Sequence, residues 1–389
     1  MLWLRARAQR LTNESATARR PQAILHDVCG LQAQVWSAAT LGMRARSAGL
    51  DAGTVNRALN HDRAIVRTWL MRGTLHVVAA EDVRWLLQLL GPVFAHAAAR
   101  RHAQLGLDDD LKSRGVAAIR AILAKTGPLT RYELVDQLRK WRVVLDAKTQ
   151  APIHLIALAG LMGVVCLGPD RNGASTYVLL DDWVAKARTP ARETALAELA
   201  RRYFGAFGPA TVDDLGAWSG LPISEVRSGI AGARASLAEV SVQGKPGFVP
   251  KQRRALRAAS VRTDVRLLPA FDTYLLGYRR RDQAVSPALQ RRLQRGGGWL
   301  HPAVVVDGRA VAAWSLRRSG LRGRLAVEPF EALTKAVRAG VDNEVADVGR
   351  FLGISVQSEV LGRLAAGPSP TPRISSEWLR RRCRCCRNR

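Results

Sequence analysis

The chain has 389 residues, of which 47% are hydrophobic, and its formal net charge is +28. This length allows about two to four small domains, and so strong a basic excess makes nucleic acid the first partner to expect. No run is long and apolar enough for a membrane span, and basic residues interrupt the N-terminal segment where a signal peptide needs its apolar core. We therefore expect a cytoplasmic protein that does not enter membranes.

The cysteines argue against both a disulfide framework and a zinc site. Cys29 and Cys166 stand alone, and the other three, Cys383, Cys385 and Cys386, lie together near the end. Neither the paired Cys-x-x-Cys spacing of zinc sites nor a regular disulfide pattern is present. We expect no metal and no cofactor, and we interpret the terminal trio as part of an unstructured basic tail.

The N-terminal region predicts three helices followed by a hairpin. A first helix covers Pro21–Cys29 and ends at a glycine, and a second covers Gln32–Arg46 with its small and apolar residues on one face. Asp51 can cap a third helix that runs through Asn60. Residues 65–70 and 74–78 are expected to pair as a hairpin around Arg72 and its neighbours.

A repeated pattern predicts two further helical turns. The segments GPLTRYEL at 127–134 and GPATVDDL at 208–215 both read Gly-Pro-x-Thr-x-x-acid-Leu. Thr130 and Thr211 are natural N-caps, and the acid three residues later can complete a capping box. Gly-Pro ends the preceding helix, so each copy indicates a helix, a tight turn and a second helix.

Similar elements follow both copies of the repeat. After the first, residues 153–161 can form a helix, and 164–167 and 177–180 flank a strong turn signal. After the second come a helix at about 223–235 and short strands at 237–242 and 247–249. Three helices and a β-hairpin are the parts of a winged helix. Past about residue 255 the character changes, and residues 303–306 and 310–314 enclose a two-residue turn signal, which indicates a β-rich C-terminal unit.

We therefore predict an α+β fold made of three tandem winged-helix units and a β-rich C-terminal unit. The expected boundaries are 1–95, 96–185 and 186–255 for the winged helices, 256–365 for the β-rich unit, and 366–389 for a disordered basic tail.

Two glutamines one residue apart, in the segment GLQAQ at 30–34, are the most informative chemical feature. Glutamine cannot take a proton, but its carbonyl accepts and its NH₂ donates, so the pair could hold a water molecule. That is sufficient when the leaving group is already cationic, as an N-alkylated purine is. On spacing alone, a helix-capping amide beside a solvated surface residue explains the pair better than catalysis does.

The segments GLQAQ, RTWLMRGTLH at 67–76, LLPAFDTYLLGYRRRD at 267–282 and VDGRAVAAW at 306–314 together resemble the winged-helix DNA glycosylases of the AlkZ type. This family removes alkylated purines and unhooks interstrand crosslinks, and Gln32 and Gln34 match its two catalytic amides. A related branch has Asp at the second position, so Gln34 is closer to the crosslink-unhooking, antibiotic-resistance branch. The resemblance implies a C-shaped body around a DNA channel, with a hairpin that reaches into the duplex.

The resemblance also suggests DNA-binding residues. The hairpin at 303–314, with Arg309 and Trp314, is our candidate for the element that enters the duplex, and Arg279 is expected to face DNA. Asp272 is interpreted as a cap or turn residue and not as a catalytic acid.

The hairpin around Arg72 is a second candidate DNA contact. Arg67, Arg72 and His76 are candidates to bind phosphates. Trp69 and Leu75, which lie between them, fit a hydrophobic core. Arg72 also fits a turn residue, and His76 also fits a structural role or a contact with the water held by the glutamines.

These expectations combine into one leading function. The chain is predicted to be a monomeric, cofactor-independent DNA glycosylase acting on double-stranded DNA with bulky or crosslinked N-alkylated purines, in repair or antibiotic self-resistance. The alternative is a non-catalytic winged-helix DNA-binding protein or transcriptional regulator, which would favour one DNA sequence over damage.

Overall fold

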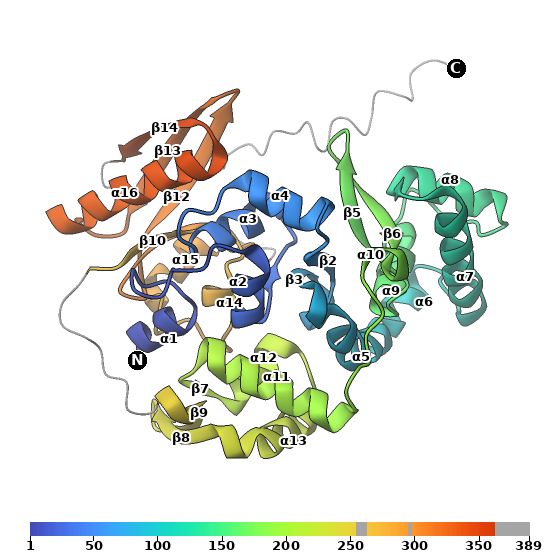
Figure 1. The fold of residues 1–389 in the computed structure, drawn as a ribbon, viewed down its shortest axis with the longest axis horizontal. Helices are drawn as coiled ribbons and strands as arrows, with labels where there is room; N and C mark the ends of the chain where they lie inside the picture. The colour runs from blue at the N-terminus through green and yellow to red at the C-terminus, as the bar shows by residue number, and fades with distance from the viewer. Residues whose placement is uncertain (254–262, 295–297, 362–389) are drawn as a thin grey trace.

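The structure, a computed structural model, describes residues 1–253, 263–294 and 298–361. Helices and mainly antiparallel sheets alternate along the chain, which confirms the predicted α+β class. In the view of Figure 1 the C-terminal sheet lies at one end of the long axis, and helices α7 and α8 lie at the other. The predicted basic tail, with its three cysteines, lies outside the described residues.

The N-terminal segment forms four short helices and three strands. They are α1 (Leu2–Ala8), α2 (Pro21–Val28), β1 (Leu31–Gln32), α3 (Trp36–Arg44), α4 (Ala52–Asn60), β2 (Ile65–Trp69), the 3₁₀ turn η1 (Met71–Gly73) and β3 (Leu75–Ala79). Asp51 caps α4 by accepting from the backbone N–H of Thr54 at 2.7 Å, as expected.

One expected helix is shorter than predicted. The helix placed at Gln32–Arg46 begins only at Trp36, because Leu31 and Gln32 pair with β3 as a strand. The small and apolar residues of 38–43 keep their helical face, but the four residues before Trp36 take strand or bend geometry. Sequence periodicity could not separate these states, because the strand partner lies more than forty residues away.

The second segment adds a helical layer and a hairpin. It contains α5 (Ala80–Ala97), α6 (Ala99–Gln104), α7 (Asp109–Thr126), β4 (Leu129–Thr130), α8 (Arg131–Lys140), α9 (Ala151–Leu161), β5 (Val165–Arg171), β6 (Ala174–Leu179) and α10 (Leu180–Trp183). Its strands join those of the first segment in one six-stranded sheet, ordered β1-β3-β2-β5-β6-β4. Arg67 of β2 pairs with Leu167 of β5 at the junction, so the first two predicted hairpins share one sheet.

The third segment repeats the plan around a smaller sheet. It contains α11 (Arg192–Phe207), β7 (Ala210–Thr211), α12 (Val212–Ser219), α13 (Ile223–Ala233), the 3₁₀ turns η2 (Arg234–Ser236) and η3 (Lys251–Arg253), β8 (Leu237–Val242) and β9 (Lys245–Pro250). One hydrophobic core, with Trp69, Leu155 and Phe204 among its members, runs through all three segments.

The C-terminal segment is a five-stranded sheet covered by a long helix. Its elements are β10 (Val265–Leu268), α14 (Thr273–Leu276), η4 (Pro287–Leu289), α15 (Gln290–Leu293), β11 (Ala303–Val306), β12 (Arg309–Ser319), β13 (Arg322–Pro329), α16 (Lys335–Leu352) and β14 (Ser355–Val360). Strand β14 runs parallel to β13, and α16 makes the connection. The sequence patterns above did not predict this helix, although Thr334 caps it and Gly353 ends it.

Two buried arginines connect the C-terminal segment to α3. Arg44 bonds to Glu344 at 2.9 Å and to Asp347 at 3.0 Å, both on α16. Arg46 forms two bonds to Asp272, at 2.7 and 2.8 Å, and both side chains are buried. Asp272 also caps α14 by accepting from the N–H of Tyr274, so the cap role expected for it is confirmed.

Both threonines of the repeat form the predicted capping boxes. Thr130 accepts from the N–H of Glu133, Thr211 accepts from that of Asp214, and each acid bonds back to the backbone N–H of its threonine. Thr130→Ala or Thr211→Ala should each lower the free energy of unfolding by about 1 kcal/mol. Urea denaturation measures the loss, with Thr189→Ala in the irregular connection before α11 as control. Variants as stable as wild type would contradict the caps.

Candidate active site

The Gln-Ala-Gln segment lies at the edge of the six-stranded sheet, with Gln32 in β1 and Gln34 in the bend that follows. Strand β1 pairs only with β3 in the described sheet, with Gln32 opposite His76. Beyond β1, Ala33 donates its N–H to Leu75 at 2.7 Å, and its carbonyl accepts from Nε of Arg67 at 3.0 Å. Both amides therefore lie at the sheet edge and outside any helix.

A glycine makes this strand pairing possible. Gly30 has φ +90°, and a Cβ there would lie 2.8 Å from Cγ1 of Val78 and 3.1 Å from the carbonyl of Val77. Any other residue would be strained in this conformation and would push β3 away. Gly30 thus turns the chain from the end of α2 directly into β1.

The two amides differ in what surrounds them. Gln32 is half-buried, and its Oε1 accepts from Nη2 of Arg72 at 3.0 Å. Gln34 is exposed and lines a pocket that Arg72 also lines. The bond to Arg72 fixes which way the Gln32 amide points and leaves one acceptor site and the NH₂ group for another molecule. One oriented amide and one accessible amide, each with hydrogen-bonding groups to spare, can together hold a water molecule.

Arg72 is held inside the protein as well as against Gln32. Its Nη1 donates to the carbonyl of Trp218 in α12, and its backbone is left-handed with φ 57°. Burial lowers the pKa of the guanidinium, and the nearby charge of Arg281 lowers it further. The predicted phosphate contact therefore competes with two internal bonds, and the geometry favours a positioning role.

If the amide pair acts on the glycosidic bond, as the family resemblance implies, Arg72→Met should slow base release about tenfold, because the Gln32 amide would lose the donor that orients it. Arg72→Lys should recover part of the rate, since an ammonium can still donate to Oε1. Single-turnover base release measures both variants, with DNA affinity recorded in parallel. A Met variant that loses affinity but keeps its rate on bound DNA would point instead to a phosphate contact.

His76 is a buried neutral residue and not a phosphate ligand. Its side chain is only 2% exposed, and Nδ1 donates to the carbonyl of Thr74 at 3.0 Å. Burial, with the charge of Arg72, lowers its pKa from 6.5 to about 3. The imidazole is therefore uncharged at neutral pH, and the contacts support the structural role that we expected as one alternative for this histidine.

Two other expected DNA contacts, Arg67 and Trp314, are buried, and so is Trp69. Arg67 is buried, and its Nε donates to the carbonyl of Ala33, so it holds the backbone of the Gln-Ala-Gln segment in place. Trp314 is 5% exposed, and its indole N–H donates to Leu268 at 2.8 Å. Trp69, also buried, is the core residue that we expected as one alternative.

The hairpin chosen to enter the duplex is packed against the protein instead. The hydroxyl of Tyr274 donates to the carbonyl of Gly308 at 2.7 Å, and Leu2 of α1 lies against the same turn. This turn therefore cannot reach into DNA. Arg309 at the start of β12 is exposed, as is Arg279, whose guanidinium lies 3.4 Å from Asp213.

A different hairpin carries the exposed basic groups. Strands β12 and β13 extend to a turn at Gly320 and Leu321, where Leu321 is 76% exposed. Arg317, Arg318 and Arg322 are exposed around this turn. The sequence signal lies in RRSGLRGR at 317–324, just beyond the segment ending at Trp314 that carries the family resemblance.

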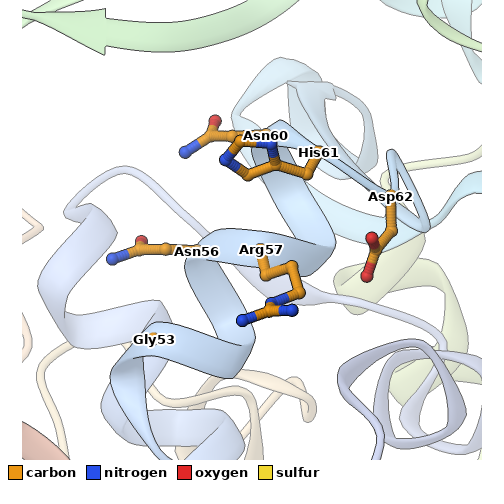
Figure 2. A pocket seen from close by; sticks show the side chains of 6 residues that line it. All are labelled: Gly53, Asn56, Arg57, Asn60, His61 and Asp62. Carbon is orange, nitrogen blue, oxygen red and sulfur yellow. The ribbon is translucent and has the colours of Figure 1, made fainter.

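A shallow pocket lies on the polar side of α4. Its volume is about 460 Å³, and Figure 2 shows the amide groups of Asn56 and Asn60 extending to the same side of the helix. Gly53, Arg57, His61 and Asp62 complete it, all exposed. Because the pocket is open and all its residues come from α4 and the turn after it, it offers hydrogen-bonding groups but no enclosed reaction site.

Among the residues that the structure describes, the cysteines and the potential metal ligands form no second centre. Cys29 and Cys166 are buried and free, and burial raises the pKa of both thiols, to about 12 for Cys29. Within residues 1–253, 263–294 and 298–361, no cluster of three potential metal ligands occurs. In the same ranges no helix has the length and hydropathy of a membrane span.

Comparisons with known proteins agree with the resemblance. Residues 25–351 match the family described as DNA glycosylase AlkZ-like. The chain is 30% identical over 369 residues to an interstrand DNA cross-link repair glycosylase of Streptomyces sahachiroi, across 90% of this chain and 95% of that protein. The solved structure of Streptomyces sahachiroi DNA glycosylase AlkZ matches with a TM-score of 0.78 and 27% identity, over 92% of this chain and 98% of the other.

Proposed function

The chain belongs to the AlkZ-like family of DNA glycosylases, and we propose that it hydrolyses the N-glycosidic bond of bulky or crosslinked N-alkylated purines in double-stranded DNA. The observation that carries this proposal is the amide pair, with Gln32 oriented by Arg72 and Gln34 exposed at the edge of a pocket. Gln32 and Gln34 are the proposed catalytic residues.

The proposed reaction depends more on placing a water molecule than on transferring a proton from the enzyme. An N7-alkylated purine carries a positive charge, so its bond to C1′ breaks with the electron pair leaving on the neutral base. The water held by Gln32 and Gln34 adds its oxygen to C1′ as the sugar becomes cationic, and its proton passes to solvent. Amide dipoles stabilise this cation when their oxygens face it, although neither amide takes up the proton.

Exposed basic groups supply the proposed DNA surface. Arg317, Arg318 and Arg322 on the β12–β13 turn would contact phosphates, and Arg309 and Arg279 are exposed on the same C-terminal segment. We propose the three helix-and-hairpin segments as winged-helix units that position a monomer along the duplex. The β12–β13 turn replaces the 303–314 hairpin as our candidate for the element that enters DNA.

Base release from a duplex with one N7-alkylguanine tests the function. Purified protein should release the alkylated base in single turnover faster than spontaneous depurination, and it should leave an unmodified duplex intact. A second duplex with an interstrand crosslink between two N7-alkylated purines tests unhooking. The alternative, a regulator, predicts no release and a preference for one undamaged sequence.

The affinity for duplex DNA should fall steeply as salt rises, because each neutralised phosphate releases counterions. If about six phosphates are contacted, affinity should drop roughly 1,000-fold between about 50 and 200 mM salt. Fluorescence anisotropy measures the slope, and Arg318→Ser should reduce it by about one. An affinity almost independent of salt would exclude a phosphate-binding surface.

A further inference from the structure

A pocket of about 400 Å³ opens directly beside Gln34. The turn η1 and strand β2 of the first segment form one side, through Arg72 and Trp69. Helices α5, α6 and α9 of the second segment form the other. Its volume lies within the range of small-molecule binding pockets and is far larger than a methyl substituent requires.

The walls of this pocket are apolar and aromatic. Phe94, Ile153, Leu158 and Leu161 line it together with Trp69. The Phe94 ring is held close to Gly220, the residue that ends α12, since a Cβ there would lie 2.9 Å from two atoms of the ring. Trp69 stacks on Tyr177 with ring centroids 6.3 Å apart, which fixes the opposite wall.

The polar groups of the pocket carry little charge. His102 and His154 meet edge to face with ring centroids 5.6 Å apart, and burial lowers the pKa of both imidazoles. They are therefore neutral at neutral pH. No carboxylate is among the described residues that line the pocket, and its one permanent cation, Arg72, is bonded to Gln32 and Trp218. Such a site suits an uncharged aromatic group.

We infer that this pocket holds the N7 substituent of the alkylated purine, an uncharged aromatic group, while Gln32 and Gln34 act on the glycosidic bond. The inference rests on the proposed function and adds the substrate class. The inference depends on the pocket being continuous with the proposed active site, because Gln34 and Arg72 belong to that site and also line the pocket. Alanines at Ala97, Ala98 and Ala157 leave the room that the substituent occupies.

The test fills the pocket and compares two substrates. Two duplexes differ only in one N7 substituent, methyl in one and naphthylmethyl in the other. Ala157→Phe should slow release of the naphthylmethyl base at least about tenfold more than it slows release of the methyl base. Ala103→Phe, on the exposed side of α6, is the matched control and should affect neither.

A second variant and a second measurement keep the test decisive. Ile153→Trp fills the same space if Ala157→Phe does not fold, as judged by circular dichroism. Calorimetric titration with free N7-naphthylmethylguanine should detect binding to wild type and to Ala103→Phe, and no binding to the filled variants.

Each outcome points one way. A wild-type protein inactive on both duplexes removes the proposed function itself. If wild type is active but the filled variants slow release of both bases equally, or of neither, the pocket assignment alone is overturned. A wild type active on the methyl base only also overturns it. Activity on the naphthylmethyl base only, lost in Ala157→Phe and kept in Ala103→Phe, supports it.

Discussion

Gln32→Ala or Gln34→Ala is expected to slow base release about 10- to 1,000-fold, equivalent to roughly 1.4 to 4 kcal/mol of transition-state stabilisation. The cationic purine needs no proton from the enzyme, so what each variant loses is the placement of water and the dipole that faces the sugar cation. Affinity for damaged DNA should stay near wild type, because exposed arginines, and not the amides, supply most of the attraction to phosphates.

The two amides should not be equivalent to every substitution. Gln34 is exposed and has room, so Gln34→Asp should keep part of the activity, since a carboxylate can hold the same water and favours the sugar cation. Gln32 accepts from Arg72. Gln32→Glu should therefore form a charged pair with that guanidinium and hold its carboxylate away from the water.

Single-turnover assays on an N7-alkylguanine duplex, with spontaneous depurination subtracted, measure these effects. Gln88→Ala is the matched control, because Gln88 is exposed on α5 and lines none of the pockets described above. Equal rates for wild type and the double Gln32→Ala, Gln34→Ala variant would sink the catalytic assignment and leave a DNA-binding protein as the remaining hypothesis.

Local signals in the sequence predicted local structure well. The caps at Asp51, Thr130 and Thr211 and the strands on both sides of Arg72 form as expected, because their stabilising contacts lie within a few residues of one another.

Features that depend on distant partners escaped prediction. The strand at Gln32 exists because of β3, and the burial of Trp314 depends on β10, whose Leu268 accepts its N–H. Arg72 was expected as a turn or phosphate residue, and its bond to Gln32 joins two positions forty residues apart. The pocket beside Gln34 needs α9 from the second segment, so motifs within the first segment could not indicate it.

Removing one partner of the Arg46–Asp272 pair should give the largest loss of stability. Both side chains are buried, and the two bonds between them join α3 to the C-terminal segment across 226 positions of sequence. Arg46→Met would leave the Asp272 carboxylate buried beside an apolar chain. Such a change typically costs about 3–5 kcal/mol, because the remaining charge has lost both water and its partner.

The double variant separates the pair from its environment. Arg46→Met with Asp272→Asn removes both charges, so it should be more stable than Arg46→Met alone. Arg114→Met, which removes an exposed ion pair with Asp110, is the control and should change stability little. Urea denaturation followed by circular dichroism gives the free energies of unfolding.

The same variants show whether the pair also supports the active site. Helix α3 begins two residues after Gln34, and Arg46 lies two residues beyond its end, so α3 connects the exposed amide to this anchor. At a temperature where Arg46→Met is still folded, its rate of base release should stay near that of wild type although its free energy of unfolding is lower. The reason is that β3 and Arg67 hold the Gln-Ala-Gln segment independently of this pair. If Arg46→Met unfolds no more easily than Arg114→Met, the buried pair does not anchor α3.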